Sequence, residues 1–310
     1  MSPTIMMNIE KVLRSERLTL ALTGLNPNEF TELLPTFDQV WRNVRQQDYR
    51  RNRKHRTRKP GGGRKGFLRE MQDKLFFILF YYKCYPTYDV LTFLYGFDWG
   101  NGFRKQEQMT EILEKTLGKK MALPERRLKK VEEFFEMFPE AREVFVDGTE
   151  RPVQRPKDSK AQTEKYSGKK KRHTLKNIII TNKKKKILFL SKTEGGRQHD
   201  FTMVKKHAPP NKIPEKVKQH MDLGFKGYQA QFPNHRISMP ERKPRTHDLC
   251  QTKVNQNKRK SSIRVLVEHA ICGVKRFRIV TDVFRNKVEG VGDKAMLISC
   301  GLWNYHLATR

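Results

Sequence analysis

Three carboxylates lie on separate segments of expected regular structure. Asp147 closes an apolar run that starts at Glu143, Asp222 follows a weaker strand candidate, and Glu268 lies in a helical segment. Hard cations such as Mg²⁺ take oxygen ligands and keep coordination positions for phosphate and water. Two such ions about 3.5 to 4 Å apart can activate an attacking oxygen and stabilise a leaving one. The three acids, converging from separate elements, therefore predict metal-assisted chemistry at a phosphate.

The segment that carries Glu268 is predicted to be a helix over Ser262–Ile279. Arg264, Glu268 and Lys275 fall within about 40° of one another on one face of that helix. An acid in so basic a field is either neutralised by Arg264 one turn away or kept to hold a metal. A surface ion pair of that kind contributes only about 0.3 to 0.5 kcal/mol, and we favour the metal.

The charge of the chain points to a polyanionic partner. The 310 residues include 65 Lys and Arg against 33 Asp and Glu, which gives a net charge of +32. Dispersed basic residues gain affinity for nucleic acid through counterion release from phosphates. An anionic membrane surface is the alternative, but the basic residues lie mostly in expected loops rather than on an amphipathic helix. No apolar run approaches the roughly 18 residues of a membrane span, and no signal peptide is evident.

The chain is expected to have four parts. Residues 1–49 form an N-terminal helical segment, and residues 50–66 form a basic, flexible, glycine-interrupted linker. Residues 67–140 read as a helix-turn-helix DNA-binding region. Residues 141–310 are predicted to form an α/β domain, with a strand ending at Asp147 and a closing helix near the C-terminus.

The helix-turn-helix prediction depends on three apolar helical segments, the last of which covers Phe103–Leu117 after a turn at Gly96–Gly102. An ordinary helical bundle is the alternative. If the region reads DNA, the exposed side of the last helix presents to phosphates or base edges Arg104, Lys105, Gln106 and Gln108.

In the α/β part, Asn177–Thr181 and Ile187–Lys192 are predicted to form a hairpin, and Asp200–His207 a helix with Asp200 as its N-cap. Residues 229–260 are basic and proline-containing with little periodicity. The helix of Glu268 is expected to follow directly.

Five segments together resemble a known family. They are V-D-G-T-E-R-P-V at 146–153, Y-S-G-K-K-K-R-H-T-L-K at 166–176, G-G-R-Q-H-D-F at 195–201, D-L-G-F-K-G-Y at 222–228 and R-V-L-V-E-H-A-I-C-G-V-K-R-F at 264–277. In this order they resemble DDE transposases of bacterial insertion sequences, in the insertion-sequence-five family and its branch related to eukaryotic Harbinger elements. The last segment fits the family's R-x3-E-x6-K signature without a gap. The resemblance spans residues 143–308 and implies a ribonuclease H-like catalytic domain, a mixed sheet flanked by helices, preceded by an all-α DNA-binding region.

The resemblance implies a role for each acid. Asp147 is the first catalytic acid and metal ligand, and Glu268 is the third. The second acid follows the fourth strand of the family's fold, which favours Asp222. Asp200, in Q-H-D-F, is also a family hallmark and is the alternative second acid; its structural interpretation is a helix cap that contributes about 1 kcal/mol. The implied cofactor is Mg²⁺, two ions, with Mn²⁺ as a substitute.

The resemblance also implies DNA contacts. Arg264 and Lys275 are expected to hold phosphates beside the acids. The family's tyrosine three residues before Arg264 is replaced by Ser261, which puts a stacking contact there in doubt. A basic run is expected to line the DNA channel, the alternative being a solvated charge run; its members are Lys169, Lys170, Lys171, Arg172 and His173.

The activity implied is that of a DNA transposase that binds the terminal inverted repeats of its element in double-stranded DNA. It cleaves a strand with metal-activated water and joins the freed 3′-hydroxyl to target DNA, as a homodimer or larger assembly in the cytoplasm of a bacterium, on its nucleoid. The alternatives are a domesticated DNA-binding protein without catalysis and a metal-dependent endonuclease that does not join.

Overall fold

The computed structural model divides into two compact units. The first contains Met1–Leu123, Arg276–Ile279 and Tyr305–Arg310, and the second contains Pro124–Lys275 and Val280–Asn304. This boundary lies before the one predicted at residue 141, and the predicted linker falls largely outside the described residues. The structure describes residues 7–53, 68–128, 130–208, 212–244 and 246–309.

The first unit is helical. Its main helices are α1 (Ile9–Leu13), α2 (Glu16–Thr23), α3 (Pro27–Arg51), α4 (Met71–Cys84), α5 (Tyr88–Tyr95) and α6 (Trp99–Lys119). Asn26 and Glu29 form a reciprocal capping box at the start of α3. The Glu29 side chain is 1% exposed and lies 2.6 Å from Nδ1 of His306, from the C-terminal segment of the same unit.

The turn between α5 and α6 is shorter than the predicted turn over Gly96–Gly102. Gly96 ends α5 with φ of 69°, and the Asp98 side chain accepts a hydrogen bond from Asn101 N and so caps α6. Because of that cap, α6 begins at Trp99 rather than at Phe103. Gln106 was predicted to face DNA, but it is buried and bonded to the Tyr88 hydroxyl and to Thr110. Arg104, in contrast, is exposed on the same helix.

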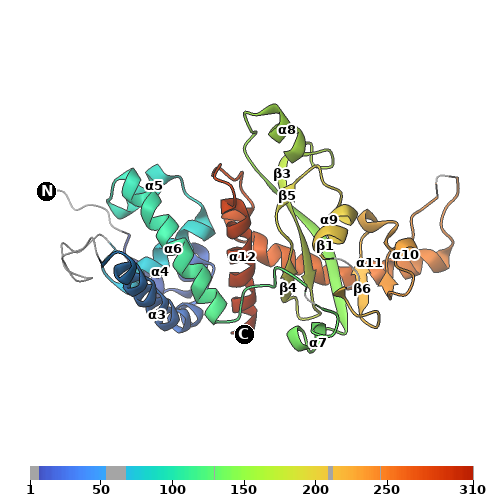
Figure 1. Cartoon of the computed structure of the whole chain (residues 1–310), viewed down its shortest axis with the longest axis horizontal. Helices are drawn as coiled ribbons and strands as arrows, with labels where there is room; N and C mark the ends of the chain where they lie inside the picture. Colours follow the sequence, from blue (N-terminus) through green and yellow to red (C-terminus); the bar gives the residue numbers. More distant parts are fainter. Residues whose placement is uncertain (1–6, 54–67, 129, 209–211, 245, 310) are drawn as a thin grey trace. The chain divides into compact units, whose positions relative to one another are not determined.

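The second unit is a mixed sheet with helices around it (Figure 1). Its strands are β1 (Glu143–Pro152), β2 (Tyr166–Ser167), β3 (Arg172–Thr181), β4 (Ile187–Leu190), β5 (Glu194–Gly195), β6 (Lys218–Met221) and β7 (Ile237–Ser238). Its helices are α7 (Phe134–Met137), α8 (Ser159–Lys165), α9 (Asp200–His207), α10 (Tyr228–Gln231), α11 (Gln251–Lys275) and most of α12 (Val291–Ala308), with 3-10 turns η3 (Leu223–Phe225) and η4 (Arg278–Val280), the latter shared between the units.

Strand β1 organises the sheet. It pairs antiparallel with β3 along its length, and its first residues pair parallel with β6 up to Val146↔Met221. Strand β7 continues the parallel part beside β6, and β4, β5 and β2 pair with β3. Since β6 ends at Met221, β1 continues past it from Asp147 onward.

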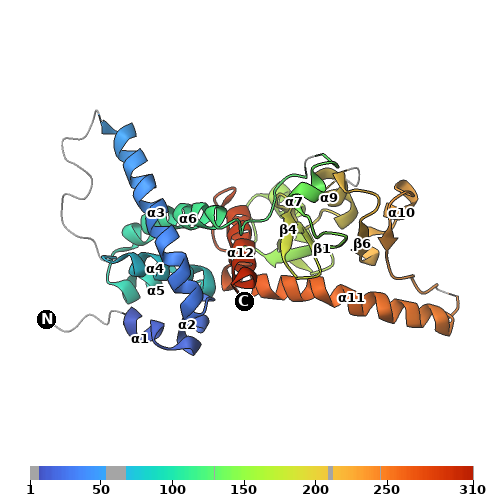
Figure 2. The ribbon, with the colours of Figure 1, turned by 90° about the horizontal axis from the view of Figure 1, so that it is seen from below.

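Apolar residues of β1 and β3 form a core with α9. Val146, Ile178 and Ile180 are buried together with Met203 and Val204. The α11 helix contacts β1 and β6 through its C-terminal half, where its buried residues begin at Val267 (Figure 2).

Two boundaries in this unit correct the sequence prediction. The α11 helix starts at Gln251, well before Ser262, and ends at Lys275. The segment predicted to be irregular contains α10 and β7 as well as the start of α11. In the parts of the chain that the structure describes, no helix is long and apolar enough to cross a membrane.

Candidate active site

A polar pocket of about 240 Å³ lies in the second unit at the open edge of β1. It brings together Asp147, Asp222, the alternative acid Asp200 and several predicted DNA-binding cations. Its lining consists of Asp147, Gly148, Glu150, Lys169, Lys170, Asp200, Asp222, Arg264 and Lys275.

Parallel pairing explains why Asp147 and Asp222 meet. Val146 is in register with Met221, so the next residue of each segment is an aspartate at the same level of the sheet. Carboxyl ends of adjacent parallel strands are where α/β proteins gather functional groups. Asp147 does not end its strand as predicted, because β1 continues to Pro152.

Asp200 reaches the pocket from the start of α9. The predicted N-cap role is wrong: His199 is the cap residue, and no side chain caps this helix. Two glycines make room for the carboxylate instead. A Cβ on Gly148 would lie 2.7 Å from Asp200 Oδ1, and one on Gly224 would lie 3.1 Å from Oδ2.

A buried lysine that the sequence reasoning missed holds Asp200. The Lys176 ammonium lies 3.2 Å from Asp200 Oδ1 and 3.2 Å from Glu150 Oε1, and the Lys176 and Glu150 side chains are each 8% exposed. Glu150 and Lys176 are cross-strand partners in β1 and β3. Burial raises the pKa of Glu150, but hydrogen bonds from Ser167 and Thr174 and the Lys176 charge outweigh it and hold the pKa below its usual range.

Helix α11 supplies the cations on the other side. Arg264 Nη1 lies 3.2 Å from Asp222 Oδ1, so its partner is Asp222 and not Glu268. Glu268 is exposed and does not line the pocket, and within the described residues it forms no hydrogen bond or ion pair. It occupies the helical face between Arg264 and Lys275, both of which do line the pocket.

The pocket concentrates negative charge around Asp147. Burial raises the pKa of Asp147 to about 6, and the charges of Asp222 and Asp200 add to that rise against the Gly148 N–H bond and Arg264. Burial also lowers the pKa of Lys275, and Lys170 nearby contributes to the decrease. A carboxylate whose charge is opposed by other carboxylates is suited to a cation.

The donor chemistry fits a hard divalent cation. Nε of Arg264 is buried and has no hydrogen-bond partner in the described structure, and Asp200 Oδ1 has only the ion pair with Lys176 at 3.2 Å, which leaves polar capacity at the pocket for an ion or a phosphate. Among the described residues, no three acidic, imidazole or thiol side chains form a ready metal cluster. The pocket therefore has the oxygen ligands that Mg²⁺ prefers without a completed coordination sphere.

The predicted basic run divides between two places. Lys169 and Lys170 line the acid pocket, whereas His173 lines a second pocket on the same unit. Lys171 lies in the turn between them with φ of 53°, and Arg172 is exposed at the start of β3. Arg104 and Lys105 belong to the first unit.

Comparisons with known proteins identify a family for the chain. A family model described as DDE superfamily endonuclease matches residues 146–304. The chain is 30% identical, over 258 residues, to a probable transposase for insertion sequence element IS702 of Microchaete diplosiphon, and the alignment covers 82% of this chain and 86% of that protein. No solved structure matches the chain.

Proposed function

The chain belongs to the DDE transposase family, and from this premise we propose that it is a metal-dependent DNA transposase that cleaves and joins strands at the ends of its own element. The observation that carries the proposal is the pocket where Asp147, Asp200 and Asp222 meet beside Lys169, Lys170 and Lys275. Acids that can hold metal lie there next to cations that can hold phosphate.

The ribonuclease H-like fold is part of the proposal. The strand order β4-β3-β1-β6-β7 combines antiparallel neighbours on one side of β1 with parallel neighbours on the other. The first acid lies on that central strand, and a second follows the adjacent parallel strand. This arrangement supports a catalytic domain of that kind, preceded by the helices α4 to α6 as a helix-turn-helix region that contacts DNA through Arg104 and Lys105.

We assign the metal ligands to Asp147 and Asp222 in the pocket and to Glu268, which lies outside the pocket lining on the α11 face between Arg264 and Lys275. Asp222 is preferred to Asp200 because it shares the sheet edge with Asp147 and faces α11 through Arg264. Asp200 is committed to Lys176 and acts as a positioning group. Held by these residues, Mg²⁺, as two ions, or Mn²⁺ would lower the pKa of an attacking water and would stabilise the leaving oxygen.

The cations of the pocket hold the scissile phosphate. Lys169, Lys170 and Lys275 are not paired with the aspartates in the ion pairs of this site, so they are available to DNA. Water attacks the phosphodiester and frees a 3′-hydroxyl. That hydroxyl attacks a target phosphodiester, a new P–O bond forms, and the target strand leaves with its own 3′-hydroxyl. Because both ends of the element are cleaved and joined in one transposition event, the protein acts as a homodimer or larger assembly on DNA.

The test is a cleavage and strand-transfer assay on labelled DNA taken from both flanks of the gene, with Mg²⁺ or Mn²⁺. Wild type is compared with Asp147→Asn, Asp222→Asn and Glu268→Gln, and binding of the DNA is measured for each. Metal-dependent joining that is lost in all three variants while binding is kept supports the proposal. Cleavage without joining identifies an endonuclease, and binding without cleavage identifies a DNA-binding protein that has lost catalysis.

A further inference from the structure

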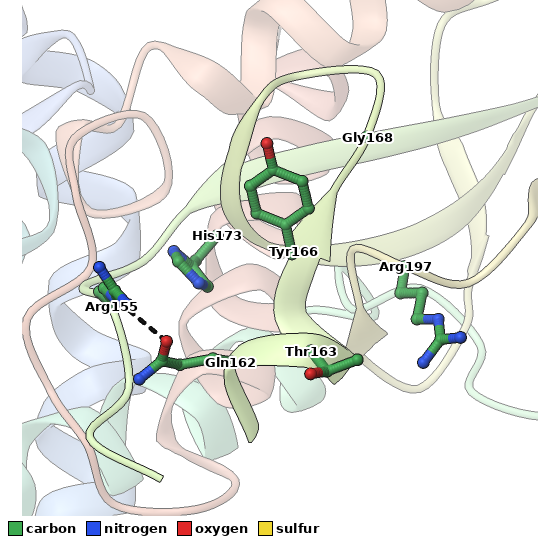
Figure 3. Close-up of a pocket in the computed structure, with 7 residues that line it drawn as sticks. All are labelled: Arg155, Gln162, Thr163, Tyr166, Gly168, His173 and Arg197. Atoms are coloured by element: carbon green, nitrogen blue, oxygen red, sulfur yellow. Dashed lines mark hydrogen bonds between the residues drawn. The ribbon is translucent and has the colours of Figure 1, made fainter. Parts of the chain in front are cut away.

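A second pocket, of about 620 Å³, lies in the second unit on the insertion between β1 and β3. Its size is within the range of small-ligand sites. Seven residues from α8, β2, β3 and three connecting segments line it (Figure 3): Arg155, Gln162, Thr163, Tyr166, Gly168, His173 and Arg197. We propose that this pocket binds one unpaired nucleotide of the DNA, with its base against Tyr166 and its phosphate at the arginines. The proposal rests on the proposed function, since it takes DNA as the substrate.

The two pockets lie on opposite faces of the same short ladder. Tyr166 and His173 are direct partners in the β2–β3 pairing, so their side chains share a face, and both line the second pocket. The next residue on each strand points the other way: Ser167 and Thr174 hydrogen-bond Glu150, which lines the acid pocket. A single turn joins the sites, since Gly168 lines one and Lys169 and Lys170 line the other.

Aromatic groups form one wall of this pocket without belonging to a core. Tyr166 is 42% exposed, and the centroid of its ring lies 5.7 Å from that of His173 at an interplanar angle of 70°. Because the residue is this exposed, part of its ring surface is available for stacking. Stacking of a base on such a face tolerates any base, because every base has a π surface.

Cations flank the aromatic wall. Figure 3 shows Arg155 on one side of Tyr166 and Arg197 on the other, with Arg155 bonded to Gln162 at 3.0 Å. No acid is among the lining residues, and within the described structure neither arginine has a carboxylate partner. Guanidinium groups match phosphate oxygens in geometry and charge. The Gln162 amide and the Thr163 hydroxyl add groups that can hydrogen-bond a base edge.

The walls are fixed before any ligand enters. Arg197 N donates to Glu164 O at 3.2 Å, and Gly196 N donates to Thr174 O at 3.0 Å. A Cβ on Gly195 would collide with the Glu164 carbonyl oxygen, so the glycines of the G-G-R motif let this loop lie directly against α8. A preformed pocket lowers the ordering cost of binding.

The experiment compares two duplexes of identical sequence, one fully paired and one with a single unpaired 2-aminopurine, without divalent metal, using the full chain. We expect wild type to bind the second duplex about tenfold more tightly and to quench its fluorescence. Tyr166→Ala should lose the preference and the quenching while binding paired DNA as wild type does, and Tyr166→Phe should keep both. Arg197→Ala should reduce the preference more than Lys192→Ala, which removes an exposed charge outside both pockets.

The outcomes separate the two proposals. Equal binding of both duplexes by wild type, or a Tyr166→Ala defect of equal size on both, overturns the nucleotide pocket and leaves the transposase proposal in place. Failure of wild type to bind either duplex overturns the proposed function itself.

Discussion

The two faces of β1 treat their carboxylates differently. Toward α11, Asp222 meets Arg264, whose side chain is 14% exposed, while Asp222 itself remains 38% exposed. Toward α9, Glu150 and Asp200 share Lys176, whose side chain is 8% exposed. On one face the acid itself lies near the surface, and on the other face two acids are bridged by an internal ammonium.

This difference suggests that the two faces of β1 have different roles. Removing one partner of an internal ion pair leaves a buried charge without compensation. Because that is costly, we expect the internal pair to stay intact in the folded protein. An ion pair whose acid is partly exposed is screened by solvent, and its acid exchanges partners more easily with an incoming ion. We therefore expect catalysis to depend most on the α11 face and stability most on the α9 face.

The largest expected effect is on catalysis by Asp147→Asn and Asp222→Asn. Each substitution removes a carboxylate from the metal-binding side, and the rate of strand cleavage should decrease about 10³-fold or more. Asp200→Asn should decrease it only about 10- to 100-fold, as expected for a group that acts through its neighbours. Single-turnover cleavage at saturating protein measures all three.

DNA binding of each variant serves as the control for folding in that experiment. If Asp200→Asn is as inactive as Asp147→Asn while Asp222→Asn retains near wild-type rates, then Asp200 is the second acid. The proposed difference between the faces would then be reversed.

The next effect is on stability. Lys176→Met should lower the free energy of unfolding by about 3 kcal/mol, because it leaves Glu150 and Asp200 without their shared cation. Urea denaturation at neutral pH measures the change. Lys192→Met, at an exposed lysine, is the matched control and should change stability by less than about 0.5 kcal/mol. Similar curves for the two variants would show that the internal ammonium is dispensable.

Part of this site could be predicted from sequence and part could not. Asp147 follows an apolar segment and Asp222 follows a weaker strand candidate, and parallel pairing of the two strands brings these positions together. Glu150 and Lys176 give no local signal, since their contact depends on the antiparallel register between β1 and β3. The pairing of Arg264 with Asp222, far away in sequence, also gives no local signal, whereas the alternative partner Glu268 lies one helical turn away.

The helices of the first unit show the same limit of prediction from local sequence. The start of α3 at Asn26 follows from its capping box, which is a local signal. The burial of Gln106 could not be read locally, because it depends on the position of the Tyr88 hydroxyl across the packed helices. Local chemistry therefore identifies where elements begin, whereas partner choice between distant polar groups requires the fold.

Glu29 in the first unit extends the comparison to a third acid with an internal partner. Burial raises its pKa, but hydrogen bonds from His306 and the Asn26 N–H outweigh burial, and the pKa is lowered from 4.5. A lowered folded pKa means stability that is present above the unfolded value and is lost as pH falls through the folded pKa. We expect Glu29→Gln to destabilise the protein by about 2 kcal/mol at neutral pH.

The pH series decides whether that loss is electrostatic. Denaturation of wild type and Glu29→Gln should converge as the pH decreases below the folded pKa of Glu29, because wild type then also carries a neutral side chain. A constant difference across the whole series would mean that Glu29 acts by shape and hydrogen bonding alone, unlike the acids beside Lys176.

The smallest expected effect is on DNA affinity. It shows whether a lysine that lines the acid pocket contacts a DNA phosphate, as proposed. Lys170→Ala should weaken DNA binding a few-fold and reduce the slope of log affinity against log salt by about 1, because one counterion fewer is released. Lys192→Ala, an exposed lysine outside the pocket, should leave the slope unchanged. A slope unchanged in both variants would confine Lys170 to balancing the acids within the pocket. A reduced slope for Lys170→Ala alone would place a phosphate beside Asp147, because Lys170 lines the same pocket as that carboxylate.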